Sequence, residues 1–265
     1  MRMLNFTDIE KWQKKRHKKM YDFFVFCGEV FLALVDAVRH PFRIRTRETL
    51  YYLEQCGVKS VPIVLLICFL LGMILAFKGA LQLSKFGTEI FIVDLVSFSV
   101  LMELGPFMVA IIATGRAGSA FAAEIGTMIA DEEVNALSTM GISIARFIVV
   151  PKLIAMMIAL PILSAFGDIA ALLGGMCVGN LMADIPVGAY LTRTVNILDA
   201  GTFLFGIGKS VIFAFLIAFI GCYKGLQSTM DAQGVGRSAT NAVVTSILAV
   251  VICDAIIAVI DSFGG

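Results

Sequence analysis

Three carboxylate side chains lie inside long apolar stretches of this sequence, and they are its first candidates for chemistry: Glu103, Asp168 and Asp254. If these stretches cross a membrane, a charge at the centre costs roughly 2.5–3.5 kcal/mol on insertion scales, so each one needs a reason. Glu103 has the strongest case, because Gly105 and Pro106 follow it and predict a kink or break in the helix. Glu103 either lines a polar cavity or pathway, or is protonated or paired and fixes helix packing. Asp168 and Asp254 have a weaker case and could simply be hydrogen-bonded packing residues.

The sequence lacks the residue sets of membrane-embedded hydrolases. Both histidines, His17 and His40, lie in the N-terminal region, so no Ser–His dyad can form within the apolar stretches, and no H-E-x-x-H motif is present. The stretch RAGSA (116–120) lacks the glycine that follows serine in G-x-S-x-G. FLFGIGKS (203–210) ends like a phosphate-binding loop, but Phe203 stands where that motif begins with glycine. We therefore expect no catalytic residue, no bound metal and no cofactor in this chain.

The composition is that of a membrane protein with several spans. Of the 265 residues 59% are hydrophobic and only 15% charged, whereas soluble domains carry about 25% charged residues. Basic residues gather at one end, since residues 1–59 hold 12 of the 21 lysines and arginines. The six cysteines show no C-x-x-C spacing, so we interpret them as small buried hydrophobic residues rather than as disulfide or zinc ligands.

Five apolar stretches are long enough to span a bilayer, which predicts an all-α polytopic fold. Their approximate limits are 60–77, 90–114, 147–182, 202–222 and 242–260. The third is either one long helix kinked at Pro161 or a hairpin. We prefer one helix, and five spans, because 184–201 resembles a short amphipathic external helix. With the N-terminus inside, Lys and Arg divide 17 cytoplasmic to 3 external, with Lys209 within the fourth stretch, and the hairpin changes this only to 16 and 4.

The N-terminal region, residues 1–59, is expected to be cytoplasmic and interfacial, and residues 60–265 to form a single transmembrane domain. The basic cluster KWQKKRHKK (11–19) is either a solvated tail or is attracted to anionic lipid. In 21–38, three acidic residues recur every seven positions on one face of an otherwise apolar helix. Such a helix favours the membrane interface, although a sixth span stays open as an alternative.

The segment ATGRAGSAFAAEIG (113–126) is predicted to be a joint between the second stretch and a cytoplasmic helix. Gly115 and Gly118 give it flexibility, and with Gly105 and Pro106 they are the expected hinge positions. A helix is expected to start near Glu124 and continue to 146. Within it, about 128–141 is predicted to be an amphipathic docking helix, with an ordinary solvated loop helix as the alternative; its key residues are Asp131, Glu132, Glu133, Leu137, Met140 and Gly141.

Three blocks of the sequence, in this order, resemble the MlaE/YrbE family of lipid-transport permeases. They are ELGPFMVAIIATGRAGSAFAAEIGTM (103–128), PKLIAMMIALPILSAFGDIAALLGG (151–175) and CYKGLQSTMDAQGVGRSATNAVVTS (222–246). The resemblance covers roughly residues 45–262. Two positions depart from the family pattern, since Met102 and Asn241 stand where the family often has a basic residue. Any lipid contact through those charges is therefore not expected here.

The resemblance implies an ABCG-like exporter architecture, with an interfacial elbow helix, five spans and a coupling helix after the second span. It also implies a homodimer that binds two copies of a separate ABC ATPase (MlaF-like), which holds the ATP and Mg. Further partners would be a periplasmic MCE-domain ring (MlaD-like) and a small STAS-type regulator, with no nucleic acid. The cargo would be phospholipid or a related lipid, moved between the inner and outer membranes of a bacterium, with this chain in the inner membrane.

By the same resemblance, Glu103 and Leu104 would line a lipid cavity with Leu75 and Ala80. Arg116 and Arg237 would be head-group or structural charges, and 131–141 would couple the ATPase. Two rival functions are open at this point. A stand-alone proton-coupled transporter would use the three intramembrane carboxylates, although no inverted repeat is visible. A structural membrane scaffold would not need a glutamate at mid-membrane beside Gly-Pro.

Overall fold

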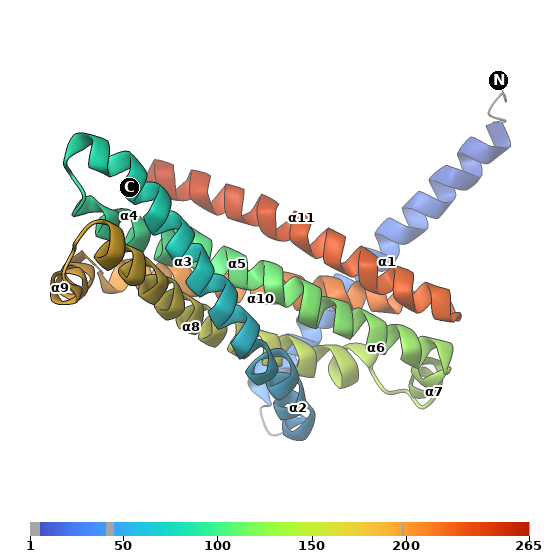
Figure 1. Cartoon of the computed structure of the whole chain (residues 1–265). Helices are drawn as coiled ribbons and strands as arrows, with labels where there is room; N and C mark the ends of the chain where they lie inside the picture. Colours follow the sequence, from blue (N-terminus) through green and yellow to red (C-terminus); the bar gives the residue numbers. More distant parts are fainter. Residues whose placement is uncertain (1–5, 41–44, 198, 265) are drawn as a thin grey trace.

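The structure is a computed structural model that describes residues 6–40, 45–197 and 199–264. Within these residues every regular element is helical, and five helical segments are long and apolar enough to cross a membrane. The five are Thr46–Phe86, Phe91–Ala130, Ala145–Met182, Gly201–Leu226 and Ala232–Phe263. Figure 1 shows the long helices lying side by side as a bundle. The predicted all-α polytopic fold is confirmed.

Two helices precede the core of the bundle. Helix α1 (Phe6–Arg39) is not among the five candidate spans, and Figure 1 shows it running out from the bundle at an angle. The rings of Phe23 and Phe26 hold it against α10 (Ala200–Leu226), where their centroids lie 5.2 and 5.5 Å from that of Tyr223. Helix α2 (Thr46–Cys56) follows and leads through a short 3₁₀ turn into the first span.

The first span, α3 (Val61–Leu83), continues beyond the predicted end at residue 77. Lys78 does not end it, because a lysine stem can lie along apolar surface while its ammonium group reaches polar surroundings. The next two residues, Gly79 and Ala80, are buried. The helix therefore keeps packing past the charge.

The second span is part of one unbroken helical segment, which we call the α4–α6 rod (residues 91–130). It comprises α4 (Phe91–Ser99), α5 (Gly105–Ala113) and α6 (Ser119–Ala130), joined by two π-helical turns. These turns are Val100–Leu104 and Thr114–Gly118. The first π turn precedes Pro106, which lacks an amide donor, so in place of the predicted kink or break the helix continues through a wider turn.

The predicted joint at 113–126 is helical throughout, so the predicted helix start near Glu124 is wrong, whereas the hinge role of Gly115 and Gly118 stays a prediction. The rod is helical through Gly115 and Gly118, and α6 already begins at Ser119. Gly118 is buried against α10, and a Cβ added to Gly221 of α10 would lie 2.9 Å from the carbonyl oxygen of Gly118. The small residues at this point thus allow two helices to approach closely.

The predicted helix 124–146 is broken into pieces. Helix α6 ends at Ala130, and α7 (Glu133–Thr139) follows after a turn in which Glu132 has φ of 60°. A second turn at Gly141, with φ of 72°, leads to a π turn at Ala145–Val149. The predicted docking helix 128–141 therefore reduces to α7 with its flanking turns. Positive φ at Glu132 interrupts a continuous helix, which the acidic composition did not reveal.

The third span is one helix, α8 (Val150–Met182), with Pro161 inside it, and not a hairpin. It lies at the centre of the bundle and crosses α3 closely. A Cβ added to Gly72 of α3 or Gly174 of α8 would overlap backbone of the other helix. Small residues at this crossing thus permit backbone contact in a region without water.

The remaining elements complete the two ends of the bundle. Helix α9 (Val187–Ile197) is tied to α4 by Arg193, whose NH2 donates to Asp94 Oδ2 at 2.7 Å. Helix α10 is the fourth span, and α11 (Ala232–Gly264) begins ten residues before the predicted fifth span. In Figure 1, α9 lies at one end of the bundle and α7 at the other.

Candidate functional site

A charged cluster connects three spans in the interior of the bundle. Lys209 Nζ of α10 lies 2.7 Å from Glu103 Oε2 in the first π turn and 3.1 Å from Asp254 Oδ1 of α11. The lysine side chain is 2% exposed, Asp254 is 19% exposed and Glu103 is 40% exposed. Nζ also lies 5.3 Å from the centre of the Phe205 ring. We call these three residues the central cluster.

The sequence left two interpretations of Glu103 open, a cavity-lining residue and a paired packing residue, and the central cluster agrees with part of each. Glu103 is paired with a neighbouring helix, as the packing interpretation expected, but its carboxylate stays partly exposed, as a cavity-lining group must be. Asp254 is hydrogen-bonded to the same lysine. Lys209 was missed as a partner, although a lysine within an apolar stretch is itself a signal that an acid lies nearby.

Asp168 does not join the central cluster. It is buried in α8 against Gly105, where a Cβ would overlap Asp168 Oδ1. Within the described residues, that oxygen has no hydrogen-bond partner. Gly105 is thus required for close approach between the α4–α6 rod and α8, in addition to any role as a hinge.

The other predicted cavity residues are partly or fully buried. Leu104 and Leu75 are half-buried, and Ala80 is 6% exposed and belongs to the core. A cavity shared between two copies is not a feature of one chain, so the lipid cavity stays a prediction.

A second charged cluster lies at the end of the bundle where α2 meets α6 and α8. Lys152 Nζ of α8 lies 2.9 Å from Glu124 Oε1 of α6 and donates to the Tyr52 hydroxyl at 2.6 Å. The Tyr52 hydroxyl donates to the same Glu124 oxygen at 2.5 Å. Lys152 is completely buried, whereas Glu124 is 42% exposed. We call these three residues the lower cluster.

Arg116 lies beside the lower cluster but forms no salt bridge among the described residues. It is exposed and lines a cavity of about 450 Å³ together with Tyr52, Phe121 and Glu124. An acid partner, one of the two roles that the sequence left open for Arg116, is therefore not found in the part of the chain that the structure describes. Binding of an anion from outside the chain, the other role, stays a prediction.

Arg237 lies in a different pocket, between the end of α10 and the start of α11. The pocket has a volume of about 580 Å³ and is also lined by Lys224, Ser228 and Asn241. Arg237 is exposed and donates to Gln233 Oε1 at 3.2 Å. Arg116 and Arg237 thus belong to separate pockets.

The predicted docking residues divide into an anchored and a free group. Leu137 is half-buried and lies near Val134, which was not among the predicted residues and is buried, so this side of α7 packs on the bundle. Met140 is 65% exposed. The acidic residues and the terminal glycine are also exposed: Asp131, Glu132, Glu133 and Gly141. The free group therefore forms a surface around α7 that a partner could contact.

The fold and the two clusters define a class, namely a polytopic helical membrane protein with charges held between its spans and a short exposed helix at one end. Comparison with known proteins narrows this class. The family described as Permease MlaE matches residues 49–260, and the chain belongs to that family. It is accordingly a permease of the ABC transporter class.

The similar proteins carry consistent names. A probable ABC transporter permease protein from Rickettsia bellii is 35% identical over 227 residues, covering 85% of this chain and 86% of the relative. A similar permease from Synechocystis is 35% identical over 229 residues, covering 86% and 85%. The intermembrane phospholipid transport system permease protein MlaE of Haemophilus influenzae is 31% identical over 246 residues, covering 92% and 94%.

Proposed function

We propose that this chain is the permease subunit of a bacterial ABC transporter that moves phospholipid, or a related lipid, between the inner and outer membranes. Its relative from Haemophilus influenzae is named for intermembrane phospholipid transport and aligns over nearly the whole chain. The chain itself hydrolyses no ATP under this proposal. A separate ATPase binds ATP and Mg, and its binding and hydrolysis drive the cycle.

The central cluster is the observation that carries the proposal. A glutamate that is 40% exposed within a span would expose polar surface to lipid tails unless it faces a polar path. When two copies of the chain assemble, Glu103 and Leu104, with Leu75 and Ala80, line a cavity in which a lipid head group is held. Lys209 and Asp254 keep the Glu103 side chain in place, since Lys209 is fixed by both carboxylates.

Coupling to the ATPase occurs at α7. Val134 and Leu137 attach α7 to the bundle, while Met140 and the acidic residues face outward. A force on α7 reaches α6 through a two-residue turn, and the α4–α6 rod carries it to Glu103. The two π turns are the places where the rod can change its hydrogen-bond register, because π turns are interruptions of the regular α-helical ladder.

The remaining partners and the location follow the family. The assembly is a homodimer in the inner membrane, with the N-terminus in the cytoplasm, two ATPase copies at α7, an MCE-domain ring on the periplasmic side and a small STAS-type regulator. Arg116 and Arg237 serve as cationic sites for lipid phosphate. Both are exposed and neither forms a salt bridge among the described residues, which leaves their charges available to an anion.

The test is a reconstituted transport assay. The chain is co-expressed with a candidate partner ATPase of the ABC class, purified, and placed in liposomes containing a fluorescent phospholipid. We expect lipid movement that requires ATP, and its loss in a Met140→Glu variant with reduced ATPase co-purification. Met182→Glu is the matched control. Met182 is also an exposed methionine, at 51%, but it is the last residue of α8 and does not belong to α7.

The rival functions predict different results. A proton-coupled transporter would move lipid in response to a proton gradient without any ATPase, and a scaffold would move none under either condition. Full recovery of the ATPase with Met140→Glu would contradict the assignment of α7 as the coupling helix.

A further inference from the structure

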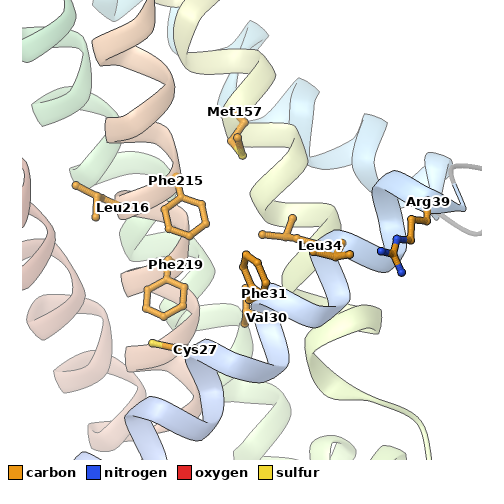
Figure 2. A pocket seen from close by; sticks show the side chains of 10 residues that line it. Cys27, Val30, Phe31, Leu34, Arg39, Met157, Phe215, Leu216 and Phe219 are labelled. Atoms are coloured by element: carbon orange, nitrogen blue, oxygen red, sulfur yellow. The ribbon is translucent and has the colours of Figure 1, made fainter.

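A groove separates α1 from the bundle, and nothing in the proposed transport path uses it. It has a volume of about 830 Å³, within the roughly 300–1,000 Å³ of small-molecule sites. One face of α1 forms one wall, α10 forms the other, and Met157 of α8 lies between them (Figure 2). On α1 the lining residues recur at helical spacing, so a single face of the helix is turned to the groove.

The walls are apolar over their whole length. Val30 of α1 and Phe219 of α10 are buried at the base, with 1% and 8% exposure. Phe31, which is 66% exposed, stands at the rim. Arg39 is the one charged residue among those lining the groove, and Figure 2 places it at the end away from Phe215 and Leu216. The lining therefore matches a ligand that is hydrocarbon along most of its length and ionic at one end.

The charge at the Arg39 end calls for an anion. Asp36, one turn earlier on α1, lies 3.1 Å from Arg146 and 4.0 Å from His40, so its carboxylate already has basic neighbours. Among the described residues Arg39 forms no salt bridge, and it is exposed. A guanidinium group without an acid binds phosphate well, because its parallel N–H donors match two phosphate oxygens.

The position of α1 favours a membrane lipid as the source of that anion. Helix α1 is not among the candidate spans, and its earlier turns carry the basic cluster 11–19. Such a helix lies at the membrane surface, where anionic head groups gather near basic residues. A transmembrane helix from a partner protein would fill the apolar walls but would leave Arg39 without an anion.

We propose that the groove between α1 and α10 binds an anionic phospholipid, with an acyl chain along the apolar walls and the phosphate on Arg39. The site is separate from Glu103, Lys209 and Asp254, none of which lines it. A bound lipid fills the space under α1 and so fixes the angle of that helix to the bundle. The proposal does not depend on the cargo or direction of transport.

The test uses the full-length chain in its native complex, placed in nanodiscs with a photoactivatable lipid. Phosphatidylglycerol and phosphatidylcholine with identical diazirine-bearing acyl chains are compared, and cross-linked peptides are mapped by mass spectrometry. Both lipids carry the phosphate, but the choline cation offsets it in phosphatidylcholine and is repelled by Arg39. We therefore expect phosphatidylglycerol to label α1 around 27–35 and α10 around 215–219 about tenfold more than phosphatidylcholine. Arg39→Glu should abolish this preference, and Arg39→Lys should retain most of it.

Two matched controls separate the groove from general effects. Arg47→Glu changes an exposed arginine of α2 that does not line the groove and should leave labelling unchanged. Leu34→Trp fills the groove and should lower labelling by both lipids, whereas Leu32→Trp, at a 68% exposed position of the same helix, should not. Since Arg39 is exposed, its variants keep the chain folded even if Leu34→Trp does not.

Three results would overturn the proposal. Equal labelling by both lipids would show that the groove does not select an anionic head group. Competition by palmitate as strong as that by unlabelled phosphatidylglycerol would assign the site to free fatty acid. If neither lipid labels the groove and a segment of another protein of the complex is cross-linked to its walls instead, the groove is the binding site of a partner helix. Glu103→Ala should leave the labelling unchanged, so failure of the transport proposal remains distinguishable.

Discussion

Two buried lysines pair with two glutamates of the same rod, yet their surroundings differ. Lys209 in the central cluster contacts two carboxylates, those of Glu103 and Asp254. Lys152 in the lower cluster contacts one carboxylate and one phenol hydroxyl. The two glutamates are 21 positions apart in the sequence, which is about 30 Å along a helix.

The different contact partners of the two lysines indicate that the two clusters have different roles. In the lower cluster, Lys152 is fully buried and its Nζ lies 3.8 Å from the centre of the Tyr52 ring, so three helices are held by one compact set of contacts. In the central cluster, the second carboxylate can hold the lysine when Glu103 moves or binds something else. We infer that the lower cluster is a fixed attachment of the rod and that the central cluster can exchange partners.

The largest expected effect is on stability, from Glu124→Ala. This change leaves the fully buried Lys152 with only the Tyr52 hydroxyl, and a buried charge without its counter-charge costs about 3–5 kcal/mol. Glu103→Ala should cost only about 1.5 kcal/mol, because Lys209 keeps Asp254. Thermal unfolding of both purified variants checks this, and equal losses of stability would contradict the distinction between the two clusters.

An intermediate effect is expected from Lys209→Met. The change leaves two neighbouring carboxylates without the cation that both contact, so we expect a loss of about 2 kcal/mol, the scale of a lost hydrogen bond to a charged group. Adding Asp254→Asn should recover part of this loss, because the like-charge contact is removed. A double-mutant cycle measured by unfolding gives the coupling, and strictly additive losses would show that the two residues do not interact.

The smallest effect on stability is expected from Arg116→Ala. Exposed side chains without partners usually change stability by less than about 0.5 kcal/mol. If Arg116 binds lipid phosphate, the variant should instead retain less anionic phospholipid through purification, measured by lipid mass spectrometry. Lys59→Ala, which removes another exposed cation, is the control. Equal amounts of bound anionic phospholipid in the unchanged protein and in both variants would contradict the head-group role of Arg116.

The class of protein and the approximate positions of the five spans could be predicted from the sequence, because an apolar segment of about 20 residues is stable as a helix across the hydrocarbon core of a bilayer. The need for partners at Glu103 and Asp254 could also be predicted, since an isolated charge there is costly. The lysine that satisfies both could not, because it lies more than a hundred residues from Glu103 in the chain and no local pattern links them.

The region after the second span shows a different limit. Small residues at 113–123 can signal either a flexible joint or a close helix crossing, and the two have the same local composition. In the structure the segment is helical at Gly118, where it packs closely against α10. Likewise, acids near 131–133 suit the interior or the start of a helix, but the positive φ of Glu132 separates α6 from α7, which starts only at Glu133.

The sequence by itself thus determined that this protein is an α-helical membrane permease, because hydropathy and the motif blocks are properties of the chain alone. Only the tertiary structure decided which charges meet, which small residues are contact points and where α1 leaves a groove. These depend on helices brought together from distant parts of the chain, whose relative rotation and depth set each contact.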